Sequence, residues 1–473
     1  MKLLFVASEC APFVKTGGLA DVIGAVPKAL DADVKVMLPA YPALAAQAAK
    51  GREVMSFDDL FGGPAKLLAV KAKGLNLLLL DAPHLYDRPG NIYLGPDGED
   101  WPDNDLRYAG LSFAAARVGA SGIDRWRPDL INAHDWQAGL VSAYLSQTGQ
   151  ETPPVVMTIH NIAFQGLFTA DQLDVLGLRS HLFTPDGIEY FGKIGFLKAG
   201  IALADKITTV SPTYARELLT PEFGMGLDGL LRARQADLSG ILNGIDLDVW
   251  NPETDKALQK TYSARAMKDK AASKAEVVSR FGLDEGDGPL FCVISRLTSQ
   301  KGLDLLLQCL PELVANGGRL AVLGSGDKEM EQAFIDAASR YHGSVGVIIG
   351  YDEGLSHLLQ GGSDAILIPS RFEPCGLTQL YGLRYGTLPI VARTGGLADT
   401  VIDANEAALV SDCATGIQFA PVTTMALRQA IARATALYAQ PKVWQGMMRR
   451  AMRHPVGWDA SAKTYAALYE TLV

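Results

Sequence analysis

Short apolar runs without polar alternation recur along this chain, each followed by turn residues and then by a helical pattern. Such runs are typical of parallel strands that are covered by helices on both faces. The first half contains "KLLFVAS", "VKVMLPA", "PDLINAH", "PPVVMTIH" and "KITTVS", and the second half contains "PLFCVISR", "RLAVLGSG", "VGVIIGY", "DAILIPS" and "LPIVAR". Two successive series favour two doubly wound α/β domains, although an eightfold (β/α) barrel also fits a chain of this length.

A polar segment with few apolar runs, residues 243–276, separates the two series. We therefore place the domain boundary there, with one domain over residues 1–243 and a second over residues 244–455. Residues from about 456 to 473 have the spacing of a helix, and the pattern alone does not assign this helix to a domain. The stretch from Gly51 to Asp105 is less regular. Its last part, Asp87–Asp105, has three prolines and three glycines, which predicts a long surface loop.

The composition narrows the partners and the location. With 43 Lys and Arg against 52 Asp and Glu, the formal net charge is -9, which argues against a broad surface for nucleic acid or for an anionic membrane. The five cysteines are odd in number and form no C-x-x-C pair, which argues against a disulfide framework or a zinc site. The apolar run Leu3–Ala7 is too short for a signal peptide, and no run reaches the roughly 18 residues of a membrane span. We expect a soluble, cytoplasmic protein with no nucleic-acid or membrane partner.

The string "TGGLAD" occurs twice, once behind Lys15 and once behind Arg393. In open α/β sheets, ligands bind at the carboxyl ends of strands, where helix N-termini point unpaired N–H groups outward. The first string follows a strand, so its glycine pair, which includes Gly18, lets a ligand approach the backbone with Lys15 at the mouth of the turn. For the string in isolation, a plain turn with a solvated lysine is the better interpretation, because glycine-rich turns are common.

Two basic residues in the second half of the chain are candidate phosphate ligands. Arg296 and Lys301 stand five residues apart at the expected start of a helix, an arrangement that suits a pyrophosphate and equally suits solvated surface charge. The glycines of "GSGD", Gly324–Asp327, lack the third glycine of a dinucleotide fingerprint, so this motif is a weak indication of dinucleotide binding.

The densest polar constellation is Ile368–Gly386. Pro374 predicts a turn from strand to helix, with Glu373 directly before it at the edge of the sheet. A carboxylate there suits contact with a sugar or with developing positive charge, whereas a lone "FEP" would more often hold a structural cap. The groups expected at the helix N-terminus are the amides of Cys375, Gly376 and Leu377 and the hydroxyl of Thr378.

Histidines and an aspartate follow two strands of the first half. His134 and Asp135 end one strand, and His160 ends the next. A single histidine in such a position is more often a hydrogen-bonded structural residue, and two on one edge shift that balance modestly. Their spacing matches no compact zinc pattern, so we predict no metal site.

Taken together, the motifs of this chain resemble those of the bacterial glycogen synthases, which are close relatives of the plant starch synthases. The match runs in order along essentially the whole chain, and the joint occurrence is specific where each motif alone is not. The motifs are "KTGGLADV", "AHDWQAG", "TIHNIAFQG", "SPTYARE", "EFGMGLDG", "NGIDLDVWNP", "SRLTSQKG", "PSRFEPCGLTQLYGLRYG" and "RTGGLADTV".

The resemblance implies a GT-B fold, with two doubly wound Rossmann-like domains facing across a cleft that closes by hinge motion. The first domain would be the acceptor side, joined by the C-terminal helix, and the second would be the donor side. The implied reaction moves glucose from ADP-glucose to the non-reducing end of an α-1,4-glucan such as glycogen, with retention of configuration, release of ADP and no cofactor.

The resemblance also implies roles for individual residues. Those implied in catalysis are Glu373, Lys15, Arg296, Lys301 and His160. Those implied in donor binding are Lys15, Gly18, Arg296, Lys301, Tyr351, Cys375, Gly376, Leu377 and Thr378. Those implied around the donor and acceptor are Asp21, Tyr93, Asp135 and Asn243.

One position departs from the wider pattern of retaining GT-B transferases. Many of these enzymes have two glutamates eight positions apart, and here the position eight after Glu373 is Tyr381. The glycogen synthases share this departure, so it puts in doubt only a second, ribose-binding glutamate. Three alternatives remain open at this point: a NAD-dependent dehydrogenase, whose full fingerprint is absent, a phosphorylase with pyridoxal phosphate, and a non-catalytic glucan- or nucleotide-binding protein.

Overall fold

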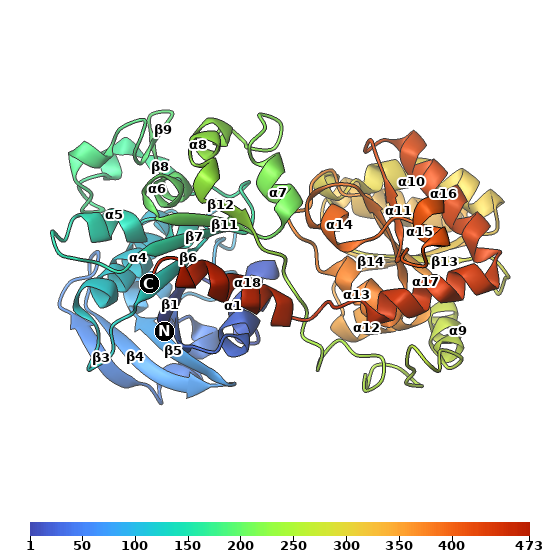
Figure 1. The fold of residues 1–473 in the computed structure, drawn as a ribbon, viewed down its shortest axis with the longest axis horizontal. Coiled ribbons are helices and arrows are strands. Elements are labelled where there is room, and N and C mark those ends of the chain that lie inside the picture. Colours follow the sequence, from blue (N-terminus) through green and yellow to red (C-terminus); the bar gives the residue numbers. More distant parts are fainter. The chain divides into compact units, whose positions relative to one another are not determined.

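The computed structural model describes residues 1–473 and divides the chain into two compact units. Unit 1 comprises Met1–Asn243 and Trp458–Val473, and unit 2 comprises Gly244–Gly457. Each unit has its own β-sheet, mostly parallel in unit 1 and entirely parallel in unit 2, with helices on both faces (Figure 1). All ten strands expected from the apolar runs are present, and both sheets are open rather than closed, so the barrel alternative is wrong.

Unit 1 is built on a nine-stranded sheet. Its order is β12-β11-β7-β6-β1-β2-β5-β4-β3, and only the β3–β4 and β4–β5 pairs are antiparallel. The central strands β6 and β7 are buried at every position, which explains their uninterrupted apolar sequences. The strands are β1 Lys2–Val6, β2 Asp33–Pro39, β3 Arg52–Phe57, β4 Ala65–Ala72, β5 Leu75–Asp81, β6 Leu130–His134, β7 Val155–Ile159, β11 Lys206–Thr209 and β12 Leu238–Gly240.

Helices and a small second sheet complete unit 1. The helices are α1 Gly18–Ala29, α2 Ala45–Ala48, α3 Pro83–Tyr86, α4 Asn104–Ser121, α5 Val141–Ser146, α6 Phe196–Leu203, α7 Pro212–Glu217, α8 Asp228–Ala233 and α18 Asp459–Glu470. The small antiparallel sheet contains β8 Leu167–Thr169, β9 Glu189–Tyr190 and β10 Lys193–Gly195. The C-terminal helix α18 packs against α1, and the Tyr469 hydroxyl donates to Asn132 Oδ1 of β6 at 2.6 Å.

The stretch from Gly51 to Asp81 is more regular than its sequence suggests. It forms β3, β4 and β5, which extend the sheet beyond β2. Strand β3 is the edge strand and β4 lies directly inside it, and both are partly exposed, so polar residues interrupt their apolar pattern. The predicted loop is correct for residues 87–103, which form no helix or strand, whereas Asn104 already begins α4.

Unit 2 is built on a six-stranded, entirely parallel sheet of order β15-β14-β13-β16-β17-β18. Its strands are β13 Leu290–Ile294, β14 Arg319–Gly324, β15 Val345–Ile349, β16 Ala365–Ile368, β17 Leu388–Ala392 and β18 Ile417–Phe419. Its helices are α9 Lys270–Arg280, α10 Leu303–Ala315, α11 Lys328–Arg340, α12 Glu353–Gly362, α13 Thr378–Tyr385, α14 Gly395–Thr400, α15 Glu406–Val410, α16 Thr424–Tyr438 and α17 Pro441–Arg453. The order reverses between β13 and β16, the kind of position where such sheets bind ligands.

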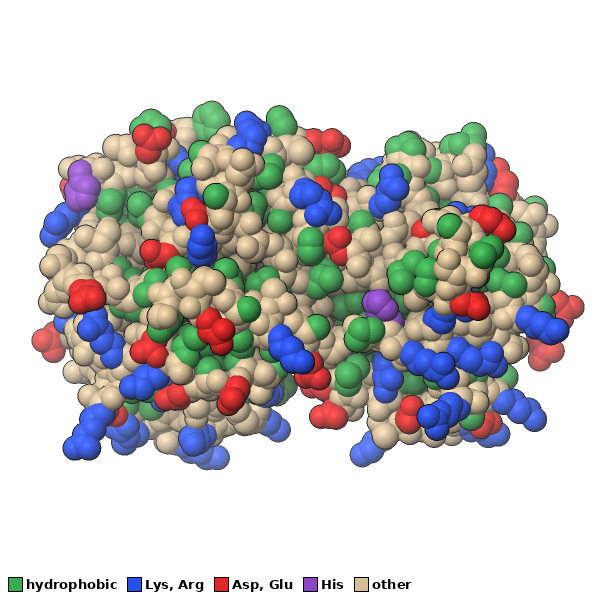
Figure 2. Space-filling view, in the orientation of Figure 1, with side chains coloured by type: hydrophobic (Ala, Val, Ile, Leu, Met, Phe, Trp, Pro, Cys, Tyr) green, Lys and Arg blue, Asp and Glu red, His purple; other side chains and the backbone are tan.

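The charge distribution on the surface and the apolar character of the helices relate to the expected absence of nucleic-acid and membrane partners. Acidic and basic side chains are interspersed over the face shown in Figure 2. No helix combines the length and the apolar character that crossing a membrane requires.

Candidate active site

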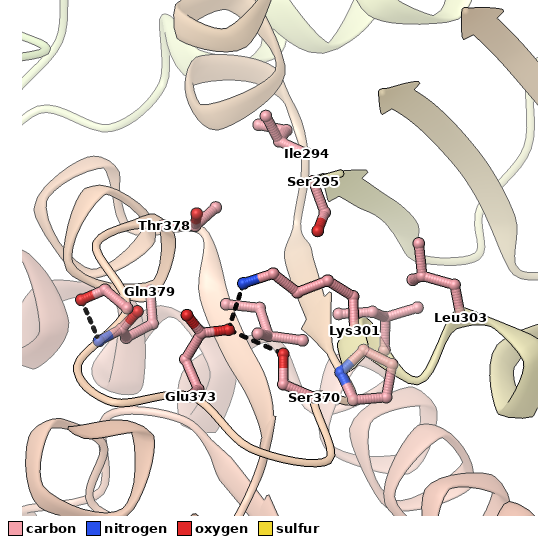
Figure 3. A pocket seen from close by; sticks show the side chains of 12 residues that line it. Ile294, Ser295, Lys301, Leu303, Ser370, Glu373, Thr378 and Gln379 are labelled. Carbon is pink, nitrogen blue, oxygen red and sulfur yellow. Dashed lines mark hydrogen bonds and ion pairs between the residues drawn. The ribbon is translucent and has the colours of Figure 1, made fainter. Parts of the chain in front are cut away.

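A carboxylate, a lysine and a hydroxyl converge in a pocket of unit 2 at the carboxyl end of β16. Lys301 Nζ lies 2.5 Å from Glu373 Oε2, and the Ser370 hydroxyl donates to the same oxygen at 2.9 Å (Figure 3). Glu373 is 9% exposed, so the ion pair is largely shielded from water. The lining of the pocket also includes Ser295, Gly376 and Thr378.

The turn that carries Glu373 is held by its own chain. Gly376 has a φ of +73°, and the Gln379 side-chain amide donates to the carbonyl oxygens of Cys375 and Gly376 at 3.0 Å each. A left-handed residue cannot belong to an α-helix, so α13 begins at Thr378 rather than at Cys375. Of the groups expected at this helix N-terminus, Gly376 and Thr378 line the pocket, while Cys375 is buried behind it and Leu377 is the N-cap residue.

The second "TGGLAD" string packs directly against this turn. The Gly396 amide donates to the carbonyl oxygens of Glu373 and Pro374 at 3.2 and 3.1 Å. A Cβ on Gly395 would lie 1.9 Å from the Glu373 carbonyl oxygen, and a Cβ on Gly396 would lie 2.3 Å from that of Cys375. The two glycines are therefore needed for close backbone approach, and this string supports the Glu373 turn from behind.

The other donor-side candidates of unit 2 lie at neighbouring strand ends. Arg296 follows β13, is exposed, and its guanidinium has no protein partner. Tyr351 follows β15 and is 76% exposed, directly before Asp352, which caps α12 by accepting from the Leu355 amide at 2.8 Å. The two predicted cations thus differ: Arg296 is free, whereas Lys301 is paired with Glu373.

The first "TGGLAD" string, in unit 1, is organised by Glu9. The Glu9 carboxylate accepts from the Thr16 amide at 2.5 Å, from the Thr16 hydroxyl at 2.7 Å and from the Gly17 amide at 3.2 Å. In contrast to the second string, a Cβ on Gly17 or Gly18 would meet no protein atom within 4 Å. The fold therefore does not demand these glycines, and the space above them is open.

Lys15, Asp21 and Tyr93 surround this turn. Lys15 Nζ forms an ion pair with Asp21 Oδ1 at 2.7 Å, and the lysine side chain is 48% exposed. Tyr93 donates to Glu9 Oε1 at 2.6 Å, and its hydroxyl lies 2.8 Å from that of Ser8. Burial and the adjacent Glu9 carboxylate raise the pKa of Tyr93 well above its ordinary value, so the phenol remains a donor.

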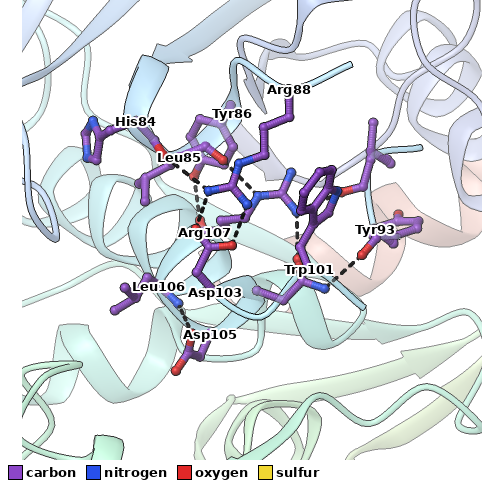
Figure 4. A network of polar contacts seen from close by, with 12 residues as sticks. His84, Leu85, Tyr86, Arg88, Tyr93, Trp101, Asp103, Asp105, Leu106 and Arg107 are labelled. Carbon is purple, nitrogen blue, oxygen red and sulfur yellow. Dashed lines mark hydrogen bonds and ion pairs between the residues drawn. The ribbon is translucent and has the colours of Figure 1, made fainter. Parts of the chain in front are cut away.

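A buried arginine holds the long loop that carries Tyr93. Arg107, which is 1% exposed, donates to the carbonyl oxygens of Leu85 and Ile92 at 2.8 and 2.9 Å, and to Asn104 Oδ1 at 2.6 Å (Figure 4). Asn104 in turn donates to the Tyr93 carbonyl oxygen at 3.0 Å. The loop predicted from prolines and glycines is therefore anchored from inside the domain.

The strand-end residues of unit 1 form a second buried polar group. His134 Nδ1 lies 3.0 Å from His160 Nε2, and Asp135 Oδ1 accepts from the His160 amide at 2.7 Å. Asp135 has a φ of +55°, and burial raises the pKa of its carboxyl to about 7. Asn243, the last residue of the first segment of unit 1, is 8% exposed.

Sequence reasoning missed two residues that organise these groups. Glu9 follows β1 and Ser370 follows β16, and both positions are strand ends of the kind that draw attention in an α/β protein. An acidic residue or a hydroxyl directly after a buried strand was thus the available signal. What each one contacts, however, lies in other parts of the chain.

The raised pKa of Asp135 predicts a pH-dependent effect on stability. Below about pH 7 the folded protein keeps a proton on Asp135 that the unfolded chain, with an ordinary pKa of 3.8, has already lost. The stabilisation from this group therefore falls as the pH rises from about 4 to about 7 and levels off above about 7. Asn carries no charge and tolerates a positive φ. The free energy of unfolding of Asp135→Asn, relative to that of wild type, is expected to increase by about 1 kcal/mol from about pH 6 to about pH 8, measured by denaturant unfolding.

The matched control for this prediction is Asp174→Asn, which removes an exposed carboxylate of the same unit. Its stability relative to wild type should not change across the same pH range. A constant difference between Asp135→Asn and wild type would contradict a raised pKa.

Comparison with known proteins identifies the family. The starch synthase catalytic domain matches residues 2–233, and glycosyl transferases group 1 matches residues 278–444. The chain is 67% identical to a glycogen synthase of Roseobacter denitrificans over 477 residues and 56% identical to a glycogen synthase of Paracoccus denitrificans over 474 residues. These alignments cover 100% of this chain and 100% and 99% of the two relatives.

Solved structures agree with this assignment. The catalytic domain of starch synthase IV from Arabidopsis thaliana, bound to ADP and acarbose, matches with a TM-score of 0.87 and 31% identity over 99% of each chain. A sucrose-phosphate synthase from Thermosynechococcus elongatus matches with a TM-score of 0.59 and 17% identity, a likeness of fold alone. The two domains are GT-B glycosyltransferase domains, and the chain belongs to the glycogen synthase family.

Proposed function

We propose that the protein transfers glucose from ADP-glucose to the non-reducing end of an α-1,4-glucan, with retention of configuration, and so elongates glycogen. The observation that carries this proposal is the Glu373 pocket, in which a shielded carboxylate, a lysine and the start of α13 meet at one strand end. A sugar diphosphate needs these groups together, because its leaving group becomes more negative while its sugar becomes more positive.

In unit 2, Arg296 and Lys301 hold the diphosphate and Glu373 faces the glucose. Arg296 is free to take a phosphate, since no protein group occupies its guanidinium. Lys301 has two roles: its ion pair holds the Glu373 carboxylate in place, and its charge lies where ADP departs. The Thr378 hydroxyl reaches the pyrophosphate, and the amides of Cys375, Gly376 and Leu377 lie in the turn that borders the sugar.

The exposed ring of Tyr351 stacks on adenine in this proposal. A ring that is 76% exposed at a strand end offers a flat apolar surface, which suits a nucleobase. The Arabidopsis relative was solved with ADP and acarbose, which supports an adenine nucleotide and a glucan-type ligand for this chain.

In unit 1, Lys15 and Gly18 contact the donor and His160 lies at the primary hydroxyl of its glucose. The open space above Gly17 and Gly18 supports this role, because no contact within the protein requires glycine at either position. Asp21, Tyr93, Asp135 and Asn243 surround the donor and the acceptor. Asp21 and Tyr93 act on the same turn, the first through Lys15 and the second through Glu9.

The reaction needs no covalent enzyme intermediate in this proposal. The acceptor hydroxyl attacks the sugar carbon from the face that ADP leaves, so the configuration at this carbon is retained. The bond from the sugar carbon to ADP breaks, and the departing ADP takes up the proton of the hydroxyl. Lys301 and Arg296 compensate the growing charge on ADP during this step.

The donor test compares transfer of labelled glucose to glycogen from ADP-glucose and from UDP-glucose, side by side. We expect the rate from ADP-glucose to be at least about tenfold higher, which corresponds to about 1.4 kcal/mol of transition-state preference. Equal or reversed rates would refute the assignment of the donor, and the absence of transfer from either would refute the function.

A further inference from the structure

The rings of His134 and His160 contact each other in the interior of unit 1. His134 is the last residue of β6, and His160 follows β7, its neighbour in the sheet. Their rings meet through His134 Nδ1 and His160 Nε2 at 3.0 Å, a distance that requires one shared proton. The direction of this hydrogen bond decides which nitrogen of His160 carries hydrogen.

Both rings are neutral at neutral pH. Burial lowers the pKa of His160 to about 3 and that of His134 well below its ordinary value. A neutral imidazole has one N–H donor and one acceptor nitrogen. Two arrangements of the pair are therefore possible, one with His134 as donor and one with His160 as donor.

The surroundings of His134 Nε2 distinguish these two arrangements. His134 is 0% exposed, its Nε2 is buried, and no protein atom accepts or donates a hydrogen bond there. The ring of Phe5 packs against the ring of His134, with ring centroids 5.2 Å apart. If His160 donated, the only proton of His134 would sit on Nε2 and leave a buried N–H without a protein acceptor, the rarest kind of unsatisfied group.

We infer that His134 donates its Nδ1–H to His160 Nε2, and that His160 consequently presents an N–H, not a lone pair, at Nδ1. His160 Nδ1 has no hydrogen bond to the protein, whereas the backbone amide of His160 is held by Asp135. His134 is thus a positioning residue: it sets the tautomer of His160 without touching substrate.

This inference deepens the proposed function and, for its substrate, rests on it. In that function His160 Nδ1–H donates to the primary hydroxyl of the transferred glucose, which leaves the proton of that hydroxyl for a different acceptor. A donor sugar that lacks an oxygen at this position leaves the N–H unpaired, so the pair contributes to selection of the sugar.

The tautomer is measured directly by long-range ¹H–¹⁵N NMR on protein labelled at its seven histidines, at about pH 7.5. Signals are assigned by their loss in His134→Asn and His160→Gln. We expect His160 Nδ1 and His134 Nδ1 to give shifts of protonated nitrogen and both Nε2 atoms to give shifts of unprotonated nitrogen. Protonated-type shifts at either Nε2 would overturn the inference.

Two variants of similar shape separate positioning from packing. Asn places an amide N–H near the position of His134 Nδ1 and can still donate to His160 Nε2, whereas Leu fills the same space without a donor. We expect kcat/KM with ADP-glucose to stay within about threefold for His134→Asn and to fall about tenfold for His134→Leu. Equal losses in both variants, at equal thermal stability, would contradict a tautomer-setting role.

Failure of the inference and failure of the proposed function are distinguishable. The NMR signature does not depend on activity, so it stands or falls even if ADP-glucose is not the donor. With ADP-6-deoxyglucose, the gap between His134→Leu and wild type is expected to narrow below about threefold. A gap that stays tenfold with this analogue would contradict the assigned contact while leaving the tautomer itself intact.

Discussion

Glu373→Gln is expected to lower kcat about 10²- to 10³-fold while it changes the affinity for ADP by less than about threefold. The substitution keeps the shape of the side chain and its contacts with Lys301 and Ser370, but it removes the negative charge. That charge is needed where positive charge develops on the sugar, and it is not needed to hold ADP.

The affinity for ADP is the more informative half of this prediction. In wild type, Lys301 shares its charge between Glu373 and an incoming phosphate, because Nζ lies 2.5 Å from Glu373 Oε2. Without the carboxylate, Lys301 is left to the phosphate alone, so ADP binding should be unchanged or slightly tighter. Steady-state kinetics and calorimetric titration with ADP measure the two quantities separately.

The control is Glu312→Gln, which removes a carboxylate that pairs with Arg428 at 3.3 Å, outside the pocket of the same unit. Its kcat should stay within about twofold of wild type. Loss of ADP affinity in Glu373→Gln in parallel with kcat would show instead that the carboxylate only organises the pocket.

Gly396→Ala is expected to lower kcat about 100-fold or more and to reduce thermal stability, although Gly396 itself does not line the pocket. The added Cβ would lie 2.3 Å from the Cys375 carbonyl oxygen and 2.5 Å from its Cα, which are backbone atoms that cannot rotate away. The Glu373 turn must therefore move, and a displacement of about 1 Å in a catalytic group costs about 100-fold.

The first "TGGLAD" string provides the matched control for this prediction. Gly18 occupies the same place in its string as Gly396, but a Cβ there meets no protein atom within 4 Å. Gly18→Ala should therefore keep the melting temperature of wild type and raise KM for ADP-glucose. If both variants lost stability equally, the two turns would have to be packed alike, contrary to the structure.

The sequence predicted most of the fold because burial leaves a local pattern. The strand β6 is buried at every position, so its five residues read as an apolar strand without any knowledge of neighbours. The edge strand β3 and its neighbour β4 were missed for the opposite reason, since their partial exposure admits polar residues such as Arg52 and Lys66.

The sequence pointed to some residues of the candidate site, but not to Glu9 or Ser370 and not to the contacts between them. Strand ends and glycine turns identified Lys15, Lys301 and Glu373 as polar residues in positions where such sheets bind ligands. The partner of each depends on which loops meet after folding: Lys301 and Glu373 are 72 residues apart in the sequence, and Glu9 and Tyr93 are 84 apart.

The two copies of "TGGLAD" show which properties follow from the sequence and which depend on the tertiary structure. The sequence by itself determined that both copies are glycine-rich turns leading into helices, and the order of its motifs determined the family to which the chain belongs. Only the tertiary structure decided that Gly395 and Gly396 are required by the backbone of the Glu373 turn while Gly17 and Gly18 face open space. The physical reason is that steric demand at a Cβ is a property of the neighbours, and these come from distant parts of the chain.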